Sequence, residues 1–167
     1  MKILGIDPGS SRCGYGLIEK SGSSLKYLSA GLIEIKESDI NQKLLYLNQD
    51  FKKLIAKHKP DLIAIEKIYF SKNIKTAIEV AQARGVLILQ TLQNNIPLVE
   101  YNPNEVKQSV TDYGSADKKA VAKLVAIHLQ IPPLKVIDDI TDALAIAITA
   151  ANHYTSFQGR SYVNKVL

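Results

Sequence analysis

The chain has 167 residues, 46% of them apolar, which suits one globular domain with a sizeable core and excludes a disordered chain. The single cysteine, Cys13, excludes an internal disulfide and fits the cytoplasm, and neither a membrane span of about 18 apolar residues nor a signal peptide is expected. The formal net charge of +5 favours a polyanionic partner such as nucleic acid, although a lysine excess alone identifies no ligand.

Three strands are predicted near the N-terminus. The runs at 2–7, 15–19 and 25–35 have the composition of strands, and turn residues at 21–24 separate the second from the third. Because short connections join strands of opposite direction, these three should form an antiparallel meander.

Helices and strands then alternate. Apolar residues at helical spacing from Leu44 to Ile55 predict a helix that ends near 57–59, before Pro60. The elements that follow are predicted as a strand over 61–66, a helix over 74–92, a strand over 96–101, and helices over 103–111, 116–130 (capped by Ser115) and 137–153. Strand–helix–strand units favour parallel pairing, so the sequence predicts an α/β fold with a mixed five-stranded sheet and helices on its faces.

The domain organisation is predicted to be simple. Residues 1–155 should form one domain, and the tail over 156–167 should be mobile. Pro132 and Pro133 are interpreted as a break between two helices and not as a domain linker.

Two acids end predicted strands. Asp7 and Glu66 each follow a strongly apolar run, where a buried carboxylate costs several kcal/mol unless it is paired or binds a cation. At the carboxyl end of a strand an acid can face the crevice in which α/β sheets bind ligands, and the two would converge if their strands were neighbours. The alternative is that each simply caps a turn.

A further acidic group opens the last predicted helix. Asp138, Asp139 and Asp142 precede eight uncharged residues, so the rest of this helix should be buried. Acids in a first turn complement the helix dipole, which explains one or two of them well and a third poorly. Helical spacing does not choose a pair, because both Asp138 and Asp139 share a face with Asp142.

Four carboxylates without a matching basic cluster need a cation. Oxygen ligands favour Mg²⁺ or Mn²⁺ over zinc, and His58, His128 and His153 stand apart in the sequence and are interpreted as structural. Two divalent ions can activate a water and stabilise the leaving oxygen in phosphodiester cleavage. An acidic centre in a basic chain is therefore typical of a nuclease.

The motifs together resemble one family. In chain order they are GIDPGS with GYG (5–10 and 14–16), AIEKIYFSKN (64–73), QARGV (82–86), VK (106–107), GSADK (114–118) and DALAIAIT (142–149). Each motif alone is weakly specific, but the ordered set resembles the RuvC-type Holliday-junction resolvases, bacterial endonucleases of the ribonuclease H-like fold. The resemblance extends to about residue 153.

The resemblance implies roles for particular residues. It matches Asp7, Glu66, Asp139 and Asp142 to the catalytic acids that bind metal, Mg²⁺ or Mn²⁺, with two ions per active site, and it leaves Asp138 without a role. Tyr69 occupies the position of an aromatic residue that stacks on a base at the opened junction. Lys107 and Lys118 match basic residues that contact phosphates near the cleavage site. Lys72, Arg84 and Lys119 could extend the track along the DNA backbone because they are basic, and the alternative for each is a solvated surface charge.

The resemblance also implies partners. It implies a homodimer that makes paired symmetric nicks in four-way junction DNA during recombination and repair, in cooperation with a branch-migration motor. The products would be 5′-phosphate and 3′-hydroxyl ends.

Other functions fit parts of the same sequence. An ATPase of the actin and sugar-kinase superfamily shares the fold and opens similarly, but it needs two such domains. A phosphate-binding P-loop fails because Tyr15-Gly16 stands where Lys-Ser/Thr is required. The presence of all four acids argues against a module that binds junctions without cleaving them. A nuclease of the same fold for RNA–DNA hybrids is not excluded by the fold, and the full motif set argues against it. Gly14 and Gly16 should allow a close approach, either of DNA or of a neighbouring element.

Overall fold

A five-stranded mixed sheet forms the centre of the molecule. The structure, a computed structural model, describes residues 1–67, 74–132 and 138–157, and for 74–75 and 155–157 it describes only the backbone. The strands are β1 (Lys2–Asp7), β2 (Arg12–Ser21), β3 (Ser24–Glu34), β4 (Leu62–Glu66) and β5 (Leu98–Tyr101), in the spatial order β3-β2-β1-β4-β5. The first three strands pair antiparallel and β1, β4 and β5 pair parallel, which confirms the predicted fold class.

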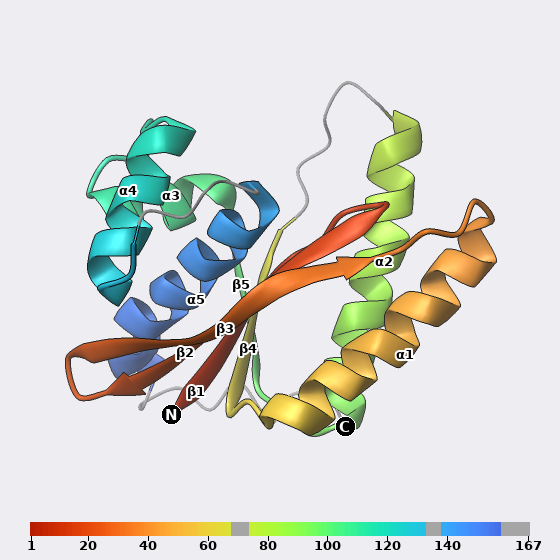
Figure 1. Cartoon of the computed structure of the whole chain (residues 1–167), viewed down its shortest axis with the longest axis horizontal. Helices are drawn as coiled ribbons and strands as arrows, with labels where there is room; N and C mark the ends of the chain where they lie inside the picture. The colour runs from red at the N-terminus through yellow and green to blue at the C-terminus, as the bar shows by residue number, and fades with distance from the viewer. Residues whose placement is uncertain (68–73, 133–137, 158–167) are drawn as a thin grey trace.

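Helices cover both faces of the sheet (Figure 1). They are α1 (Ile40–His58) and α2 (Ile74–Gln93) on one side, and α3 (Pro103–Thr111), α4 (Lys118–Leu129) and α5 (Asp138–Phe157) on the other. The order of elements agrees with the prediction. In the described part of the chain, no helix combines the length and apolarity needed to span a membrane.

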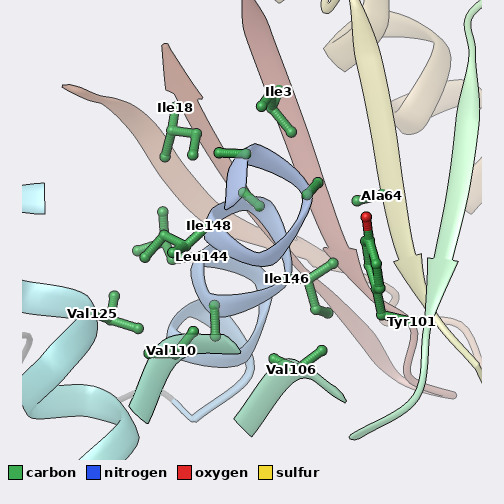
Figure 2. Close-up of a cluster of buried hydrophobic side chains, with 14 of the residues drawn as sticks. Ile3, Ile18, Ala64, Tyr101, Val106, Val110, Val125, Leu144, Ile146 and Ile148 are labelled. Carbon is green, nitrogen blue, oxygen red and sulfur yellow. The ribbon is translucent and has the colours of Figure 1, made fainter. Parts of the chain in front are cut away.

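The central strands are buried on both faces. In β1, Ile3 packs into the core beneath α5, whereas Leu4 and Ile6 pack into the core beneath α1 and α2. This alternation follows from the period of two in a strand. Figure 2 shows α5 enclosed by strand residues such as Ile3 and by side chains of α3 and α4. The predicted apolar helix is therefore confirmed as the buried centre of one face.

Several boundaries differ from the prediction. Helix α4 begins at Lys118 because Asp117 caps it, its Oδ1 accepting a hydrogen bond from the Ala120 amide at 2.7 Å, so Ser115 is not the cap. Strand β2 begins at Arg12, since it already pairs there with Glu34 of β3.

Two helices are longer than predicted. Asp39 caps α1, so the helix includes a first turn, from Ile40, that carries few apolar residues. Helix α5 continues to Phe157, which is past the predicted end at 153 and two residues into the predicted tail. The rest of that tail, 158–167, lies outside the described residues.

Candidate active site

Asp7 and Glu66 end neighbouring parallel strands. Strands β1 and β4 pair in a register that sets Ile6 beside Ile65, so the next residue of each strand is one of the two acids. Both side chains are partly buried at the carboxyl edge of the sheet. The neighbouring strands that the sequence prediction required are therefore present, and the two carboxylates lie at the same edge.

Helix α5 brings the remaining acids to this edge, because glycines let its backbone rest on the sheet. A Cβ atom on Gly14 would lie 2.0 Å from the carbonyl oxygen of Asp139, and one on Gly5 would lie 2.1 Å from that of Ala143. At Gly16 a Cβ would lie 2.8 Å from the Cα of Leu144. Real Cβ atoms do not approach other atoms so closely, so the element that approaches Gly14 and Gly16 is α5.

Burial and mutual repulsion raise the pKa values of three of these acids. Burial is the main cause that raises the pKa of Asp7 to about 8, and repulsion from Glu66, Asp142 and Asp139 adds to it. Burial and then Asp142 raise the pKa of Glu66 to about 7. The pKa of Asp142 is also raised, mainly by burial. The four predicted acids therefore share one partly desolvated site.

Two lysines act on this site from α3 and α4. Lys107 and Lys118 both lower the pKa values of Glu66 and Asp142, against the larger effect of burial. The Nζ atom of Lys118 lies 3.1 Å from Oδ2 of Asp138 and 3.9 Å from Oδ2 of Asp142. The hydrogen bond with Asp138 is the main cause that raises the pKa of Lys118. Asp138 therefore pairs with a lysine at the exposed rim of the site.

Asp139 pairs with a residue that the sequence analysis did not single out. The Nε atom of Arg12, at the start of β2, forms an ion pair with Oδ2 of Asp139. Apart from this ion pair, Oδ2 is buried and has no hydrogen-bond partner among the described residues. The two aspartates thus differ, because Asp139 lies deeper than Asp138 and meets a different cation.

The donor chemistry of the site fits a divalent metal ion. The acids offer only oxygen ligands, which suit Mg²⁺ or Mn²⁺. They are partly desolvated and repel one another, and a bound cation would relieve that repulsion. As the side chains stand, however, no group of three or more His, Cys, Asp or Glu among the described residues is arranged to hold an ion. Asp139 is paired with Arg12, so a metal ion that took its Oδ2 as a ligand would have to displace that guanidinium.

The three histidines lie within the scaffold. The Nε2 atom of His128 is 3.1 Å from the carbonyl oxygen of Val110. The rings of His58 and His153 pack 6.4 Å from that of Tyr15 and 5.4 Å from that of Tyr101, measured between centroids. These contacts fit the structural role expected for them.

The other predicted DNA-binding residues have different surroundings. Lys119 is exposed in the first turn of α4, next to Lys118. Arg84, on α2, instead pairs with Glu100 and donates a hydrogen bond to the main chain of Glu66. Tyr69 and Lys72 lie outside the described residues. Arg12 and Glu100 were not predicted from the sequence, and the position of Arg12 between the two parts of the first motif is a signal that could have identified it.

Comparisons with known proteins agree with this architecture. Residues 3–150 match the family described as "Crossover junction endodeoxyribonuclease RuvC". A protein of that name from Petrotoga mobilis is 42% identical over 163 residues, which cover 97% of this chain and 100% of the relative. Another from Caldicellulosiruptor saccharolyticus is 46% identical over 150 residues, covering 89% and 90%. The solved structure of Thermus thermophilus RuvC superposes with a TM-score of 0.84 at 25% identity, covering 93% of this chain and 96% of that one.

Proposed function

The chain belongs to the RuvC family of crossover junction endodeoxyribonucleases, and we propose that Asp7, Glu66, Asp139 and Asp142 form its active site. The reaction is the endonucleolytic cleavage of DNA at Holliday junctions, in recombination and repair. The observation that supports the proposed site is the convergence of β1, β4 and α5, which gives four acids one shared electrostatic environment.

The family's nucleases are metal-dependent, and we propose that the four acids together hold two divalent ions, Mg²⁺ or Mn²⁺. Bound ions would lower the pKa of the attacking water and stabilise the 3′ leaving oxygen. Without metal, the pKa values of about 8 for Asp7 and about 7 for Glu66 keep protons on these carboxyls near neutral pH. These protons would leave as a cation binds, so metal binding should be weaker at lower pH.

The lysines beside the acids supply the proposed contacts to DNA. Lys107 and Lys118 lower the pKa values of Glu66 and Asp142, which places their positive charges near these acids. A DNA phosphate bound at the acids would therefore also lie near these two lysines. Lys119 would extend this basic surface along the backbone. The stacking role of Tyr69 remains a prediction from the family resemblance, and the DNA contact of Lys72 remains a prediction from its charge.

We further propose that the enzyme acts as a homodimer in the cytoplasm. Ile78, Leu89 and Leu92 are exposed on α2, and their spacing of 11 and 3 residues puts them on one side of the helix. Exposed apolar side chains that share a helix face are typical of an interface. Two copies would supply one active site for each of two strands, as paired symmetric nicks require. Cooperation with a branch-migration motor is proposed from the family resemblance alone.

A synthetic four-way junction tests the proposed function. Incubated with Mg²⁺ and no ATP, the protein should nick the junction at paired symmetric positions and leave ends that a DNA ligase seals. A linear duplex and an RNA–DNA hybrid of matching sequence serve as substrate controls. Preferred cleavage of the hybrid would favour the alternative nuclease, a requirement for ATP would favour the ATPase, and binding without cleavage would favour the binding module. Asp7→Asn should abolish cleavage and retain junction binding, because it removes one metal ligand and no basic residue.

A further inference from the structure

The side chain of Arg84 joins three elements next to the active site. It projects from α2, and its Nε donates a hydrogen bond to the main-chain oxygen of Glu66 at 3.2 Å. Its Nη2 forms an ion pair with Oε1 of Glu100 on β5. Only 21% of the Arg84 side chain is exposed, and 36% of that of Glu100. One planar guanidinium thus connects the helix to the ends of two neighbouring strands.

The main chain of Glu66 is held from two sides at this point. Glu66 is the last residue of β4 and pairs with Tyr101 of β5, and the next amide, that of Lys67, donates to the Tyr101 oxygen at 2.8 Å. The strand ends here, so its ladder gives Glu66 less support than it gives residues further inside. The hydrogen bond from Arg84 adds a constraint where the side chain of Glu66 leaves for the site.

Arg84 approaches Glu66 from a different side than the other charged groups do. Apart from its strand neighbour Asp7, the charges that act on the Glu66 carboxyl are those of Asp142, Lys107 and Lys118, which lie on helices of the α3–α5 face. Arg84 comes from α2 on the opposite face, and its contact is with the main chain. Its influence on Glu66 is therefore geometric.

This arrangement leaves Arg84 poorly suited to hold a phosphate. Both its Nε and its Nη2 are already engaged, and the partner of Nη2 is a carboxylate that would repel DNA. Burial lowers the pKa of the Arg84 guanidinium, because its charge is partly desolvated. Separating this charge from its partners would therefore be costly.

We propose that Arg84, oriented by Glu100, is a positioning residue that sets the direction in which the Glu66 side chain enters the active site. The inference rests on the proposed function, since it takes Glu66 as a catalytic acid. A displacement of about 1 Å at a reacting group can cost a hundredfold in rate, so a constraint on the backbone of Glu66 matters for catalysis without any contact with substrate.

Two substitutions test the role of Arg84. Glu100→Ala removes the residue that orients the guanidinium, and Arg84→Lys keeps the charge but loses the fork that reaches two partners at once. We expect each to lower the single-turnover cleavage rate roughly 10- to 100-fold with enzyme in excess. Junction affinity should change by less than about 2-fold, because no phosphate contact is lost.

Glu79→Ala is the matched control. It breaks another ion pair of α2, between Glu79 and Lys43 of α1 at 3.3 Å, with side chains 25% and 15% exposed. This pair joins two helices and includes no strand residue, so cleavage should stay within about 2-fold of the wild type. An equal loss of cleavage in Glu79→Ala and Glu100→Ala would reduce the role of Arg84 to general stability and overturn the proposal.

A DNA-contact role gives a different pattern. If Arg84 holds a phosphate, Arg84→Ala should weaken junction binding severalfold, while Glu100→Ala frees the guanidinium and leaves binding intact or stronger. That pattern would overturn the proposal. A cleavage rate of Arg84→Lys equal to that of the wild type would also overturn it.

Metal binding provides a readout that does not depend on cleavage. Calorimetry with Mn²⁺ should give weaker binding for Glu100→Ala than for Glu79→Ala, because only the first disturbs Glu66. A wild-type protein that binds junction but does not cut it would refute the proposed function, and the Mn²⁺ comparison would still test the positioning role. Equal Mn²⁺ affinity in the two variants would refute that role even if the wild type cleaves junctions.

Discussion

The main chain of Asp139 rests directly on Gly14, with no room for a side chain between them. A Cβ atom on Gly14 would lie 2.0 Å from the carbonyl oxygen of Asp139 and 3.1 Å from its Cβ. Gly14 is also the partner of Asp7 in the β1–β2 ladder. The same glycine therefore contacts the turn that carries one proposed metal ligand and pairs with the residue that supplies another.

Gly14→Ala should separate the acids and destabilise the fold. The added methyl group has to push the start of α5 away from the sheet, because its nearest neighbours are backbone atoms that cannot rotate aside. We expect a loss of about 1–3 kcal/mol in the free energy of unfolding, which is typical of overpacking, and a fall of at least about 10-fold in cleavage. Chemical denaturation and junction cleavage measure the two effects.

Gly114→Ala is the control for this substitution. A Cβ there would have only an ordinary contact, 3.7 Å from the Asn104 carbonyl oxygen. Its stability should stay within about 0.5 kcal/mol of the wild type. If Gly14→Ala were equally mild, the close packing of α5 on β2 would not control the site.

Asp138 and Asp139 should differ sharply in cleavage. Asp139→Asn removes a proposed metal ligand and should reduce cleavage at least about 100-fold, whereas Asp138→Asn should cost less than about 5-fold, because Asp138 pairs with Lys118 at the exposed rim. Single-turnover cleavage of both variants under identical Mg²⁺ conditions measures the difference. The opposite ranking would move the ligand pair by one residue, to Asp138 and Asp142.

The topology could be predicted from the sequence because the determining signals are local. The apolar run of β1 and that of β4 each end at an acid, and alternating strands and helices favour parallel pairing. The convergence of Asp7 and Glu66 was therefore predicted on the condition that their strands are neighbours, and the pairing of β1 with β4 meets that condition. The choice between Asp138 and Asp139 did not follow from helical spacing, since both share a face with Asp142. The resemblance supplied that choice, and the deeper position of Asp139 agrees with it.

The choice between neighbouring helix caps and the contacts between distant segments could not be predicted in this way. Ser115 and Asp117 are both good caps, and only the path of the chain into α4 makes Asp117 the cap. Arg84 was expected to contact DNA because it is basic and lies in a motif. Its partners Glu66 and Glu100 lie 18 and 16 residues away on other elements, and no sequence pattern connects them.

The raised pKa values should make the metal-free protein less stable as the pH rises. Folding moves the pKa of Asp7 from 3.8 to about 8, so between these pH values the folded state binds more protons than the unfolded state does. The free energy of unfolding therefore falls as the pH rises through this window, and the fall levels off above about pH 8.

Asp7→Asn should lose the part of this pH dependence that Asp7 contributes, while the raised pKa values of Glu66 and Asp142 keep the rest. In EDTA, we compare the melting temperature of Asp7→Asn with that of the wild type at each pH. The difference, variant minus wild type, should increase by roughly 3–10 °C from pH 5 to pH 9, because the amide does not ionise. Thermal melts across this range measure the effect, and the exposed acid at Asp112, changed to Asn, provides the control. Added Mg²⁺ should restore the wild type at high pH by binding the ionised site. Parallel pH profiles for Asp7→Asn and the wild type would contradict the buried ionisation.

Arg12 should compete with the metal for Asp139. Its Nε pairs with the buried Oδ2 of Asp139, so a divalent ion that takes this oxygen as a ligand has to displace the guanidinium. The Arg12 side chain is 55% exposed, and such ion pairs are worth about 0.2–1 kcal/mol. Arg12→Gln should therefore bind Mn²⁺ roughly 1.5- to 5-fold more tightly, as measured by calorimetry on the metal-free protein.

Lys36→Gln controls for net charge in this comparison. It removes one positive charge from a lysine that is 86% exposed and pairs only loosely with Glu34, at 3.9 Å. If the tighter binding in Arg12→Gln came from the overall charge, Lys36→Gln would show it as well, and we expect it to bind Mn²⁺ like the wild type. Weaker Mn²⁺ binding in Arg12→Gln would mean that Arg12 orients Asp139 for the metal instead of blocking it. The ion pair would then be part of the assembled site, because Asp139 would need the arginine to keep its ligand oxygen in place.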